Sequence, residues 1–251
     1  MVEQKVKFFA SKHSANYKKT KRELSAYFEI GCFHLLLEFY EQAGYNLSVE
    51  NLIDEKYRYL TTPNGNPSNF SYVCMTGTDG EYEIRQQVRI KSHIDNEIAF
   101  TPDIIVLFRN SEVSSIKRVD YASGKRPFYT VSSKSVVAAH ECKSTNPFPE
   151  LLVSFIGMFI TAHEWYNETE YIRRYNLSKN GKHIAPTMFI GGAASGIHLK
   201  MIEALEKAYP INIIVGIHQG TWDVDSRPIN RLNFPTSSLG RIIYDDAQCP
   251  F

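Results

Sequence analysis

The chain has 251 residues, a length that allows one large domain or two small ones. Hydrophobic residues make up 43% and charged residues 22%, which excludes a disordered, collagen-like or fibrous chain. The formal net charge of +1 indicates no class of partner. The charge is unevenly placed, however: residues 1–22 hold seven basic residues and one acidic residue, a local charge of +6, and the remaining chain carries −5. Such clustering is typical of proteins that bind polyanions.

Three patterns bear on location. The four cysteines are widely separated and form no C-x-x-C pair, which predicts reduced thiols and a cytoplasmic protein. The N-terminal residues lack the apolar stretch of a signal peptide, so we expect no secretion. The longest apolar run covers residues 151–162, well short of the ~20 residues that cross a bilayer. It therefore predicts a buried helix and no membrane partner.

The first predicted element is a helix over residues 20–43, which ends at Gly44. Ser48 and Glu50 follow as part of a short second helix. Three strands come next, over residues 82–91, 101–108 and 135–143, because β-branched and other apolar residues dominate most of these segments. Pro102 then lies at the start of its strand or at a bulge, since proline cannot donate to a sheet.

The second half of the chain alternates between helices and strands. Pro147 and Pro149 predict the start of a helix, which continues over residues 150–166. A strand over 186–190, an amphipathic helix over 196–209 and a strand over 211–217 follow. This order predicts an α/β fold with a mixed central sheet flanked by helices.

We expect one domain over residues 1–251, because no internal repeat or long linker is visible. Its parts are a basic N-terminal arm (1–19), a core (20–217) with an insertion (109–134), and an unassigned C-terminal tail (218–251).

Charged residues at the end of an apolar strand are the first candidates for chemistry. Glu141 and Lys143 follow a run of small apolar residues, and alternation along a strand places both on one face. A buried unpaired charge is costly, so the two residues either pair with each other or meet a metal ion. A purely structural ion pair is an equally good interpretation of these two residues alone.

Two further acids change this balance. Asp103 opens the apolar strand over residues 101–108, and neighbouring strands could bring it to Glu141. Glu29 lies in the middle of the apolar stripe of the first helix, where a charge faces the sheet rather than water. Carboxylates, carbonyl oxygens and water are the ligands that Mg²⁺ prefers, so Asp103 and Glu141 predict a metal site. Glu29 is either a third acid of this site or a charge paired with a nearby Lys or Arg.

These residues resemble the PD-(D/E)XK nuclease superfamily, which has the restriction-endonuclease-like fold. Pro102-Asp103 is similar to the PD element, Glu141-Cys142-Lys143 to the (D/E)XK element, and Glu29 to the acid that many members carry on the first core helix. The order of the predicted elements is also similar to the αβββαβ core of that family. The resemblance covers about residues 20–217.

The resemblance implies metal-dependent hydrolysis of phosphodiester bonds in DNA, with RNA left open, in a restriction or antiviral-defence system. Asp103, Glu141 and the backbone carbonyl of Cys142 would hold one or two Mg²⁺ ions, for which Mn²⁺ could substitute. Lys143 would orient the attacking water or offset the developing negative charge, and Glu29 would help with a second ion or position Lys143 through water. A homodimer is a further expectation, because a duplex has two strands to cut.

Basic residues flank the candidate site in the sequence. The insertion over residues 109–134 holds six basic and two acidic residues, a net charge of +4. Basic clusters neutralise phosphates, which predicts two nucleic-acid-binding segments. Their expected contact residues are Lys18, Lys19, Lys21, Arg22, Lys117, Arg118, Lys125 and Arg126.

Two alternatives remain open. One is a nucleic-acid-binding protein of the same fold without catalytic activity. The other is a nucleotide-binding enzyme that uses the turn from Gly191 to Gly196, although this turn lacks the spacing of a P-loop.

Overall fold

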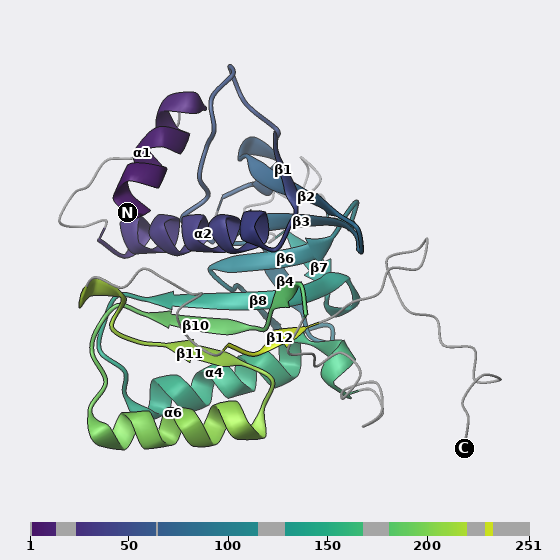
Figure 1. Cartoon of the computed structure of the whole chain (residues 1–251). Coiled ribbons are helices and arrows are strands. Elements are labelled where there is room, and N and C mark those ends of the chain that lie inside the picture. Colours follow the sequence, from purple (N-terminus) through teal and green to yellow (C-terminus); the bar gives the residue numbers. More distant parts are fainter. Residues whose placement is uncertain are drawn as a thin grey trace.

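A seven-stranded mixed sheet forms the centre of the computed structural model, which describes residues 2–13, 24–63, 65–114, 129–167, 181–219 and 229–232. Helix α2 lies on one face of this sheet, and α4 and α6 lie on the other (Figure 1). The predicted α/β architecture, with a mixed central sheet flanked by helices, is confirmed. In spatial order the strands are β1 (Asn46–Glu50), β2 (Tyr72–Gly77), β3 (Gly80–Gln86), β6 (Ile104–Phe108), β8 (Val136–Lys143), β10 (Thr187–Ile190) and β11 (Asn212–Ile214).

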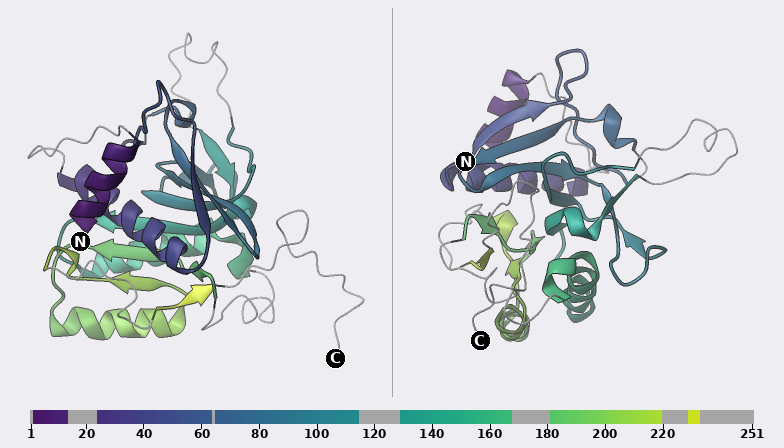
Figure 2. Two further views of the ribbon diagram at one scale, coloured as in Figure 1. Left: turned by 45° about the horizontal axis from the view of Figure 1, so that its top comes forward. Right: turned by 90° about the vertical axis from the view of Figure 1, so that its right-hand side faces the viewer.

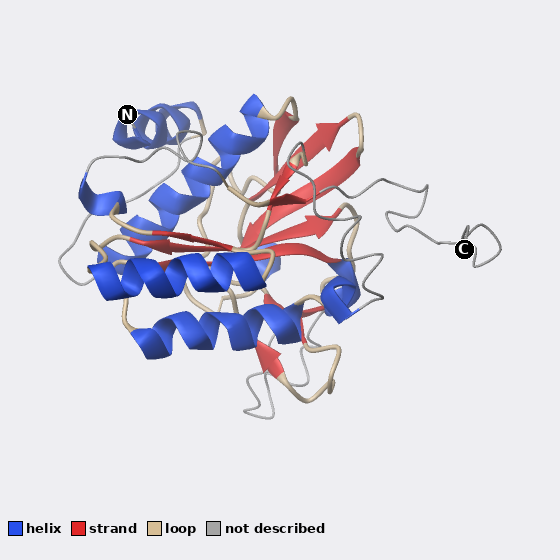
Figure 3. Ribbon diagram, turned by 60° about the horizontal axis from the view of Figure 1, so that its bottom comes forward, coloured by secondary structure: helices blue, strands red, loops and turns tan. Residues whose placement is uncertain are grey.

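The sheet changes direction at β8. Neighbouring strands from β1 to β8 are antiparallel, whereas β8, β10 and β11 are parallel. Parallel neighbours need a crossover, and α4 (Pro149–Ala162) and α6 (Gly196–Ala208) supply the two crossovers. Figure 3 shows these two helices side by side in front of the sheet. No helix among the described residues is long and apolar enough to cross a membrane.

A small sheet packs on part of the central one. It joins β5 (Ala99–Phe100), β4 (Arg89–Lys91) and β7 (Thr130–Ser132) in that order. A second hydrophobic cluster lies between the two sheets. In it, Val88, just before β4, and Ile90 of β4 pack against Ile105 of β6 and Ala139 of β8. A two-stranded sheet of β9 (His183–Ile184) and β12 (Arg231–Leu232) completes the strands that the structure describes.

Helix α2 (Leu24–Gln42) is buried on more than one side. Phe33, Leu36 and Tyr40 belong to the main hydrophobic core. Helix α1 (Val2–Lys12) covers the opposite side, where His34 is buried and hydrogen-bonds the Tyr59 hydroxyl at 2.7 Å. Much of the predicted N-terminal arm is therefore a helix packed on the core (Figure 2).

Gly44 ends α2 as expected. Its φ of +89° lies in the left-handed region that favours glycine. The Gly44 N–H donates to the Glu41 carbonyl at 3.0 Å, and the Tyr45 N–H donates to the Tyr40 carbonyl at 3.0 Å. This is the hydrogen-bond pattern of a Schellman motif, which satisfies the last carbonyls of a helix.

Two sequence predictions about secondary structure were wrong. Ser48 and Glu50 lie in strand β1 rather than in a short helix, because they pair with β2, which the sequence did not reveal. The strand expected over residues 82–91 is two strands in two sheets, β3 and β4. The chain turns between them at Gln87, whose φ is +53°. This turn sends β4 out of the central sheet.

Candidate active site

The register of β6 and β8 brings Asp103 beside the end of β8. Ile104 lies opposite His140 in this antiparallel pair, so the residue before Ile104 faces the residues that follow His140. The backbone N–H of Cys142 donates to Oδ2 of Asp103 at 2.7 Å. This hydrogen bond fixes the Asp103 carboxylate next to the Glu141-Cys142-Lys143 segment.

Lys143 links two of the predicted acids. Its Nζ donates to Oε2 of Glu141 at 2.6 Å and lies 3.5 Å from Oδ2 of Asp103. The side chain of Cys142 points the other way, into the main core. The strand alternation expected from the sequence is therefore present at this strand end.

Glu29 reaches the same place from α2. The side-chain amide of Gln87 donates to Oε2 of Glu29 at 3.2 Å and to Oδ1 of Asp103 at 2.9 Å. The structure thus brings together all four predicted catalytic residues, Glu29, Asp103, Glu141 and Lys143, which come from three separate elements of the core.

Gln87 is a site residue that the sequence reasoning missed. It is buried, and its backbone N–H donates to the Asp103 carbonyl at 3.1 Å, so both its backbone and its side chain hold Asp103. The available signal was weak. Two adjacent glutamines interrupt the strand pattern of residues 82–91. Burial of a neutral amide costs less than burial of a charge, so a glutamine in a strand does not by itself indicate a site.

The electrostatics show an excess of negative charge. Burial, followed by the charge of Asp103, raises the pKa of Glu29 to about 8. The same two causes raise the pKa of Glu141 to about 7. Burial lowers the pKa of Lys143, but the Glu141 and Asp103 carboxylates outweigh it and hold this pKa above its ordinary value. Lys143 is therefore charged, and near neutral pH protons on Glu29 and Glu141 compensate the rest of the negative charge in the metal-free protein.

The donor set suits a divalent cation. Three carboxylates and the backbone carbonyl of Cys142 are hard oxygen ligands of the kind that Mg²⁺ binds. If all three acids are ionised, three carboxylates and one ammonium leave a charge of about −2, which is the charge that a divalent cation balances. Within the described ranges, no group of three or more His, Cys, Asp or Glu side chains already has the arrangement of a metal site. The Lys143 ammonium and the Gln87 amide hydrogen-bond these carboxylates instead.

The predicted nucleic-acid-binding residues lie outside the described residues. Residues 14–23 include one set and residues 115–128 include the other. These residues are Lys18, Lys19, Lys21, Arg22, Lys117, Arg118, Lys125 and Arg126.

The glycine-rich turn before α6 already uses two of its N–H groups. The Gly191 N–H donates to the Lys143 carbonyl at 2.8 Å, and the Gly192 N–H donates to the Thr145 carbonyl at 3.0 Å. A side chain at Gly191 would collide with the His218 ring, which explains the glycine by packing. The turn therefore ties β10 to the end of β8, and these two groups do not point at a phosphate.

No protein-family model matches the chain, and no curated protein or solved structure matches it either.

Proposed function

We propose that the chain is a divalent-metal-dependent nuclease that hydrolyses phosphodiester bonds of DNA. The observation that carries the proposal is the convergence of three acids: the Gln87 amide joins Glu29 to Asp103, and the Lys143 ammonium joins Asp103 to Glu141. Acids that are buried together raise the cost of ionising one another, and such strongly shifted groups gather at functional sites.

The order of the elements supports the same proposal. Helix α2, strands β3, β6 and β8, helix α4 and strand β10 have the order α, β, β, β, α, β when the intervening strands β1, β2, β4, β5, β7 and β9 are left out. This is the order of the restriction-endonuclease-like core, and the acids stand at the strand ends that such a core would use. We propose that fold for the region from α2 to β10.

Asp103, Glu141 and the Cys142 carbonyl would hold Mg²⁺, or Mn²⁺ in its place, with Glu29 nearby for a second ion. A bound metal ion of this kind lowers the pKa of water and stabilises charge on a phosphate. The chain's own contribution is positioning: the Cys142 N–H and the Gln87 amide hold Asp103, and the Lys143 ammonium offers a proton donor to a phosphate oxygen.

A catalytically inactive nucleic-acid-binding protein is the second candidate. Its support is the ion pair itself, because Lys143 partly balances Glu141 and Asp103 without any metal. Cytoplasmic location, a homodimer and a role in restriction or antiviral defence remain parts of the proposal that the sequence alone motivates.

One experiment separates the two candidates. The full chain is incubated with duplex DNA, single-stranded DNA and RNA, each with Mg²⁺, with Mn²⁺ and with EDTA. Cleavage that requires the metal supports the nuclease. Binding that weakens steeply with salt, without cleavage of any substrate, supports the inactive binding protein.

A further inference from the structure

The face of β2 and β3 that lies away from α2 carries a pocket. The small sheet covers this face of the central sheet over β6 and β8, where its apolar residues meet Ile105 and Ala139. Farther along, a pocket of about 370 Å³ opens over β2 and β3. Its polar and aromatic lining residues are Asn51, Ser68, Tyr72, Arg85, Ser111 and Tyr129.

Arg85 is held rigidly in the wall of this pocket. Its Nε donates to Oε2 of Glu83 at 2.7 Å, and its guanidinium carbon lies 3.5 Å from the centre of the Tyr72 ring. The other oxygen of Glu83 accepts from the Asn110 N–H at 3.1 Å and lies 3.4 Å from NH1 of Arg109. Glu83 is only 2% exposed, so this carboxylate is fully used as a fixed anchor.

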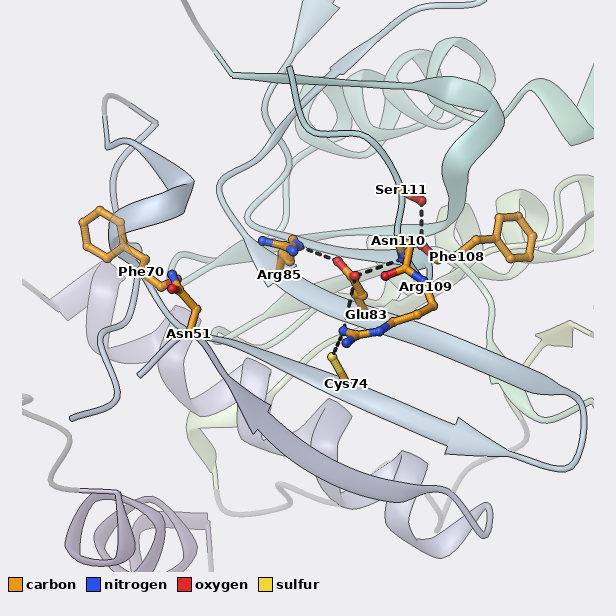
Figure 4. Close-up of polar contacts among 9 residues, drawn as sticks. All are labelled: Asn51, Phe70, Cys74, Glu83, Arg85, Phe108, Arg109, Asn110 and Ser111. Carbon is orange, nitrogen blue, oxygen red and sulfur yellow. Dashed lines mark hydrogen bonds and ion pairs between the residues drawn. The ribbon is translucent and has the colours of Figure 1, made fainter. Parts of the chain in front are cut away.

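The terminal amino groups of Arg85 are the unused part of this arrangement. Within the described part of the chain, only Nε of Arg85 has a hydrogen-bond partner. Figure 4 shows the outer end of the guanidinium turned away from Glu83, toward the side where Asn51 and Phe70 lie. The side chain is 14% exposed, and its terminal nitrogens are not among the buried atoms that lack a partner, so they reach solvent at the pocket.

The charge of the pocket favours an anion. Arg85 is the one charged residue among the described residues that line it, and no acid does so. A planar guanidinium that is fixed by a carboxylate and by an aromatic ring presents its free edge to a phosphate or carboxylate with little loss of entropy. Glu83 lies outside the pocket lining and offsets only one of the two positive charges of Arg85 and Arg109.

The size and the other walls narrow the ligand class. A volume of about 370 Å³ falls in the range of small-ligand pockets and far exceeds what a phosphate ion alone would fill. Tyr72 and Tyr129 form an aromatic wall, and Arg85 lies over the Tyr72 ring. Asn51, Ser68 and Ser111 donate their own protons within the protein, so they offer a ligand their oxygens as hydrogen-bond acceptors. We infer that this pocket binds a nucleotide unit, with its phosphate on Arg85 and its base against the tyrosine wall.

The nucleotide can come from a free mononucleotide or from an unpaired position of a nucleic-acid strand. The second source deepens the proposed function and rests on it, because the strand would then be the substrate. A base held in this pocket cannot be stacked in a duplex, so the inference predicts a preference for single-stranded or locally opened substrates.

Binding to the full chain in EDTA tests the inference without any dependence on cleavage. Calorimetric titrations use thymidine monophosphate, thymidine, inorganic phosphate and a short oligodeoxythymidine. We expect the monophosphate to bind more tightly than thymidine or phosphate. Equal binding of inorganic phosphate and the monophosphate would overturn the nucleotide assignment.

Two variants locate the binding. Arg85→Lys keeps a positive charge near Glu83 but loses the planar fork, and we expect about tenfold weaker binding of the monophosphate. Arg58→Lys is the matched control, since Arg58 is exposed and lies outside the pocket. Ser68→Tyr fills the pocket from its exposed rim, and Ser48→Tyr is the same change on an exposed strand residue outside it.

Unchanged binding in Ser68→Tyr would overturn the inference, even if Arg85→Lys failed to fold. Thermal unfolding of each variant verifies the fold. Tighter binding of the oligonucleotide than of the monophosphate identifies a strand as the source of the nucleotide. Equal binding identifies the free nucleotide. Both results support a nucleotide-binding pocket. A chain that binds nucleotides in this way but never cleaves a strand would disprove the proposed function and leave the pocket intact.

Discussion

Glu29 and Asp103 share one hydrogen-bond donor, the side-chain amide of Gln87, which lies 3.2 Å from the first carboxylate and 2.9 Å from the second. Two buried acids, one from helix α2 and one from the residue before strand β6, are thereby held together in the middle of the central sheet, where β6 begins and β8 ends. The positive φ of Gln87 places its amide there, at the point where the chain leaves β3 for the small sheet. The same turn that divides the two sheets thus also organises the candidate active site.

Replacement of this donor should impair the site. Gln87→Leu removes a hydrogen bond that favours ionised Glu29, so the pKa of Glu29 should rise further and cleavage should fall about tenfold or more. The neighbouring Gln86→Leu is a matched control, because the buried Gln86 amide has no partner among the described residues. We expect Gln86→Leu to keep its activity and its stability. Initial cleavage rates and urea unfolding of both variants provide the comparison.

The stability of the metal-free protein should depend on Glu29 and on pH. The pKa of Glu29 is raised from 4.5 to about 8 in the folded state, so the folded chain holds a proton that the unfolded chain has released. The proton on Glu29 therefore contributes fully to the free energy of unfolding below about pH 4.5, and this contribution is lost as the pH rises through about 8. Glutamine cannot ionise, so Glu29→Gln should lose less stability as the pH rises. The variant should be more stable than wild type by a few kcal/mol at pH 8.5 in EDTA.

Urea unfolding at pH 5 and at pH 8.5 measures this difference. Glu41→Gln is the control, since Glu41 is exposed on the same helix. An equal loss of stability with pH in wild type and in Glu29→Gln would show that the pKa of Glu29 is not raised in the folded protein.

Lys143 should affect metal binding and catalysis in opposite directions. Its ammonium competes with a cation for Glu141 and Asp103, so Lys143→Met should tighten Mn²⁺ binding by about tenfold while it abolishes cleavage. Mn²⁺ affinity should also fall below about pH 7, where protons occupy Glu141. Calorimetric titration of Mn²⁺ tests both statements, with Lys200→Met on exposed α6 as the control. Weaker Mn²⁺ binding in Lys143→Met would contradict the claim that the ammonium and the metal ion compete for the same carboxylates.

Two glycine substitutions test the fold rather than the site. Gly44→Ala should destabilise the protein by about 1 kcal/mol, because alanine is strained at the positive φ that ends α2. Gly157→Ala in α4 should instead stabilise it by about 0.5–1 kcal/mol, since the new methyl group meets open space within a helix. Thermal unfolding of the two variants side by side should show shifts of opposite sign.

The sequence predicted the candidate acids because each one interrupts an apolar pattern. Asp103 opens a buried strand, Glu141 and Lys143 close another, and Glu29 breaks the apolar stripe of a helix. A charge in such a place is visible without a structure, because its burial needs a reason. Gln87 carries no charge, and its role depends on a backbone turn that the residue type does not encode.

The fold was predictable where local patterns decide it and not where distant strands do. Gly44 and the apolar runs marked α2, β6, β8 and α6 within a few residues. Strand β1 was missed because Ser48 and Glu50 are polar, and only pairing with β2 makes them a strand. The burial of His34 likewise depends on α1, which packs from a separate segment of the chain.

The most direct test compares cleavage of closed circular DNA by wild type, Glu141→Gln and Glu203→Gln in Mg²⁺. Glu203 is exposed on α6, so its variant matches the chemistry of the change without touching the site. The account predicts cleavage by wild type and by Glu203→Gln, its loss in EDTA, and at least a hundredfold slower reaction in Glu141→Gln, or about 2.7 kcal/mol in activation free energy. Equal cleavage by Glu141→Gln and wild type, or activity that survives EDTA, would contradict it.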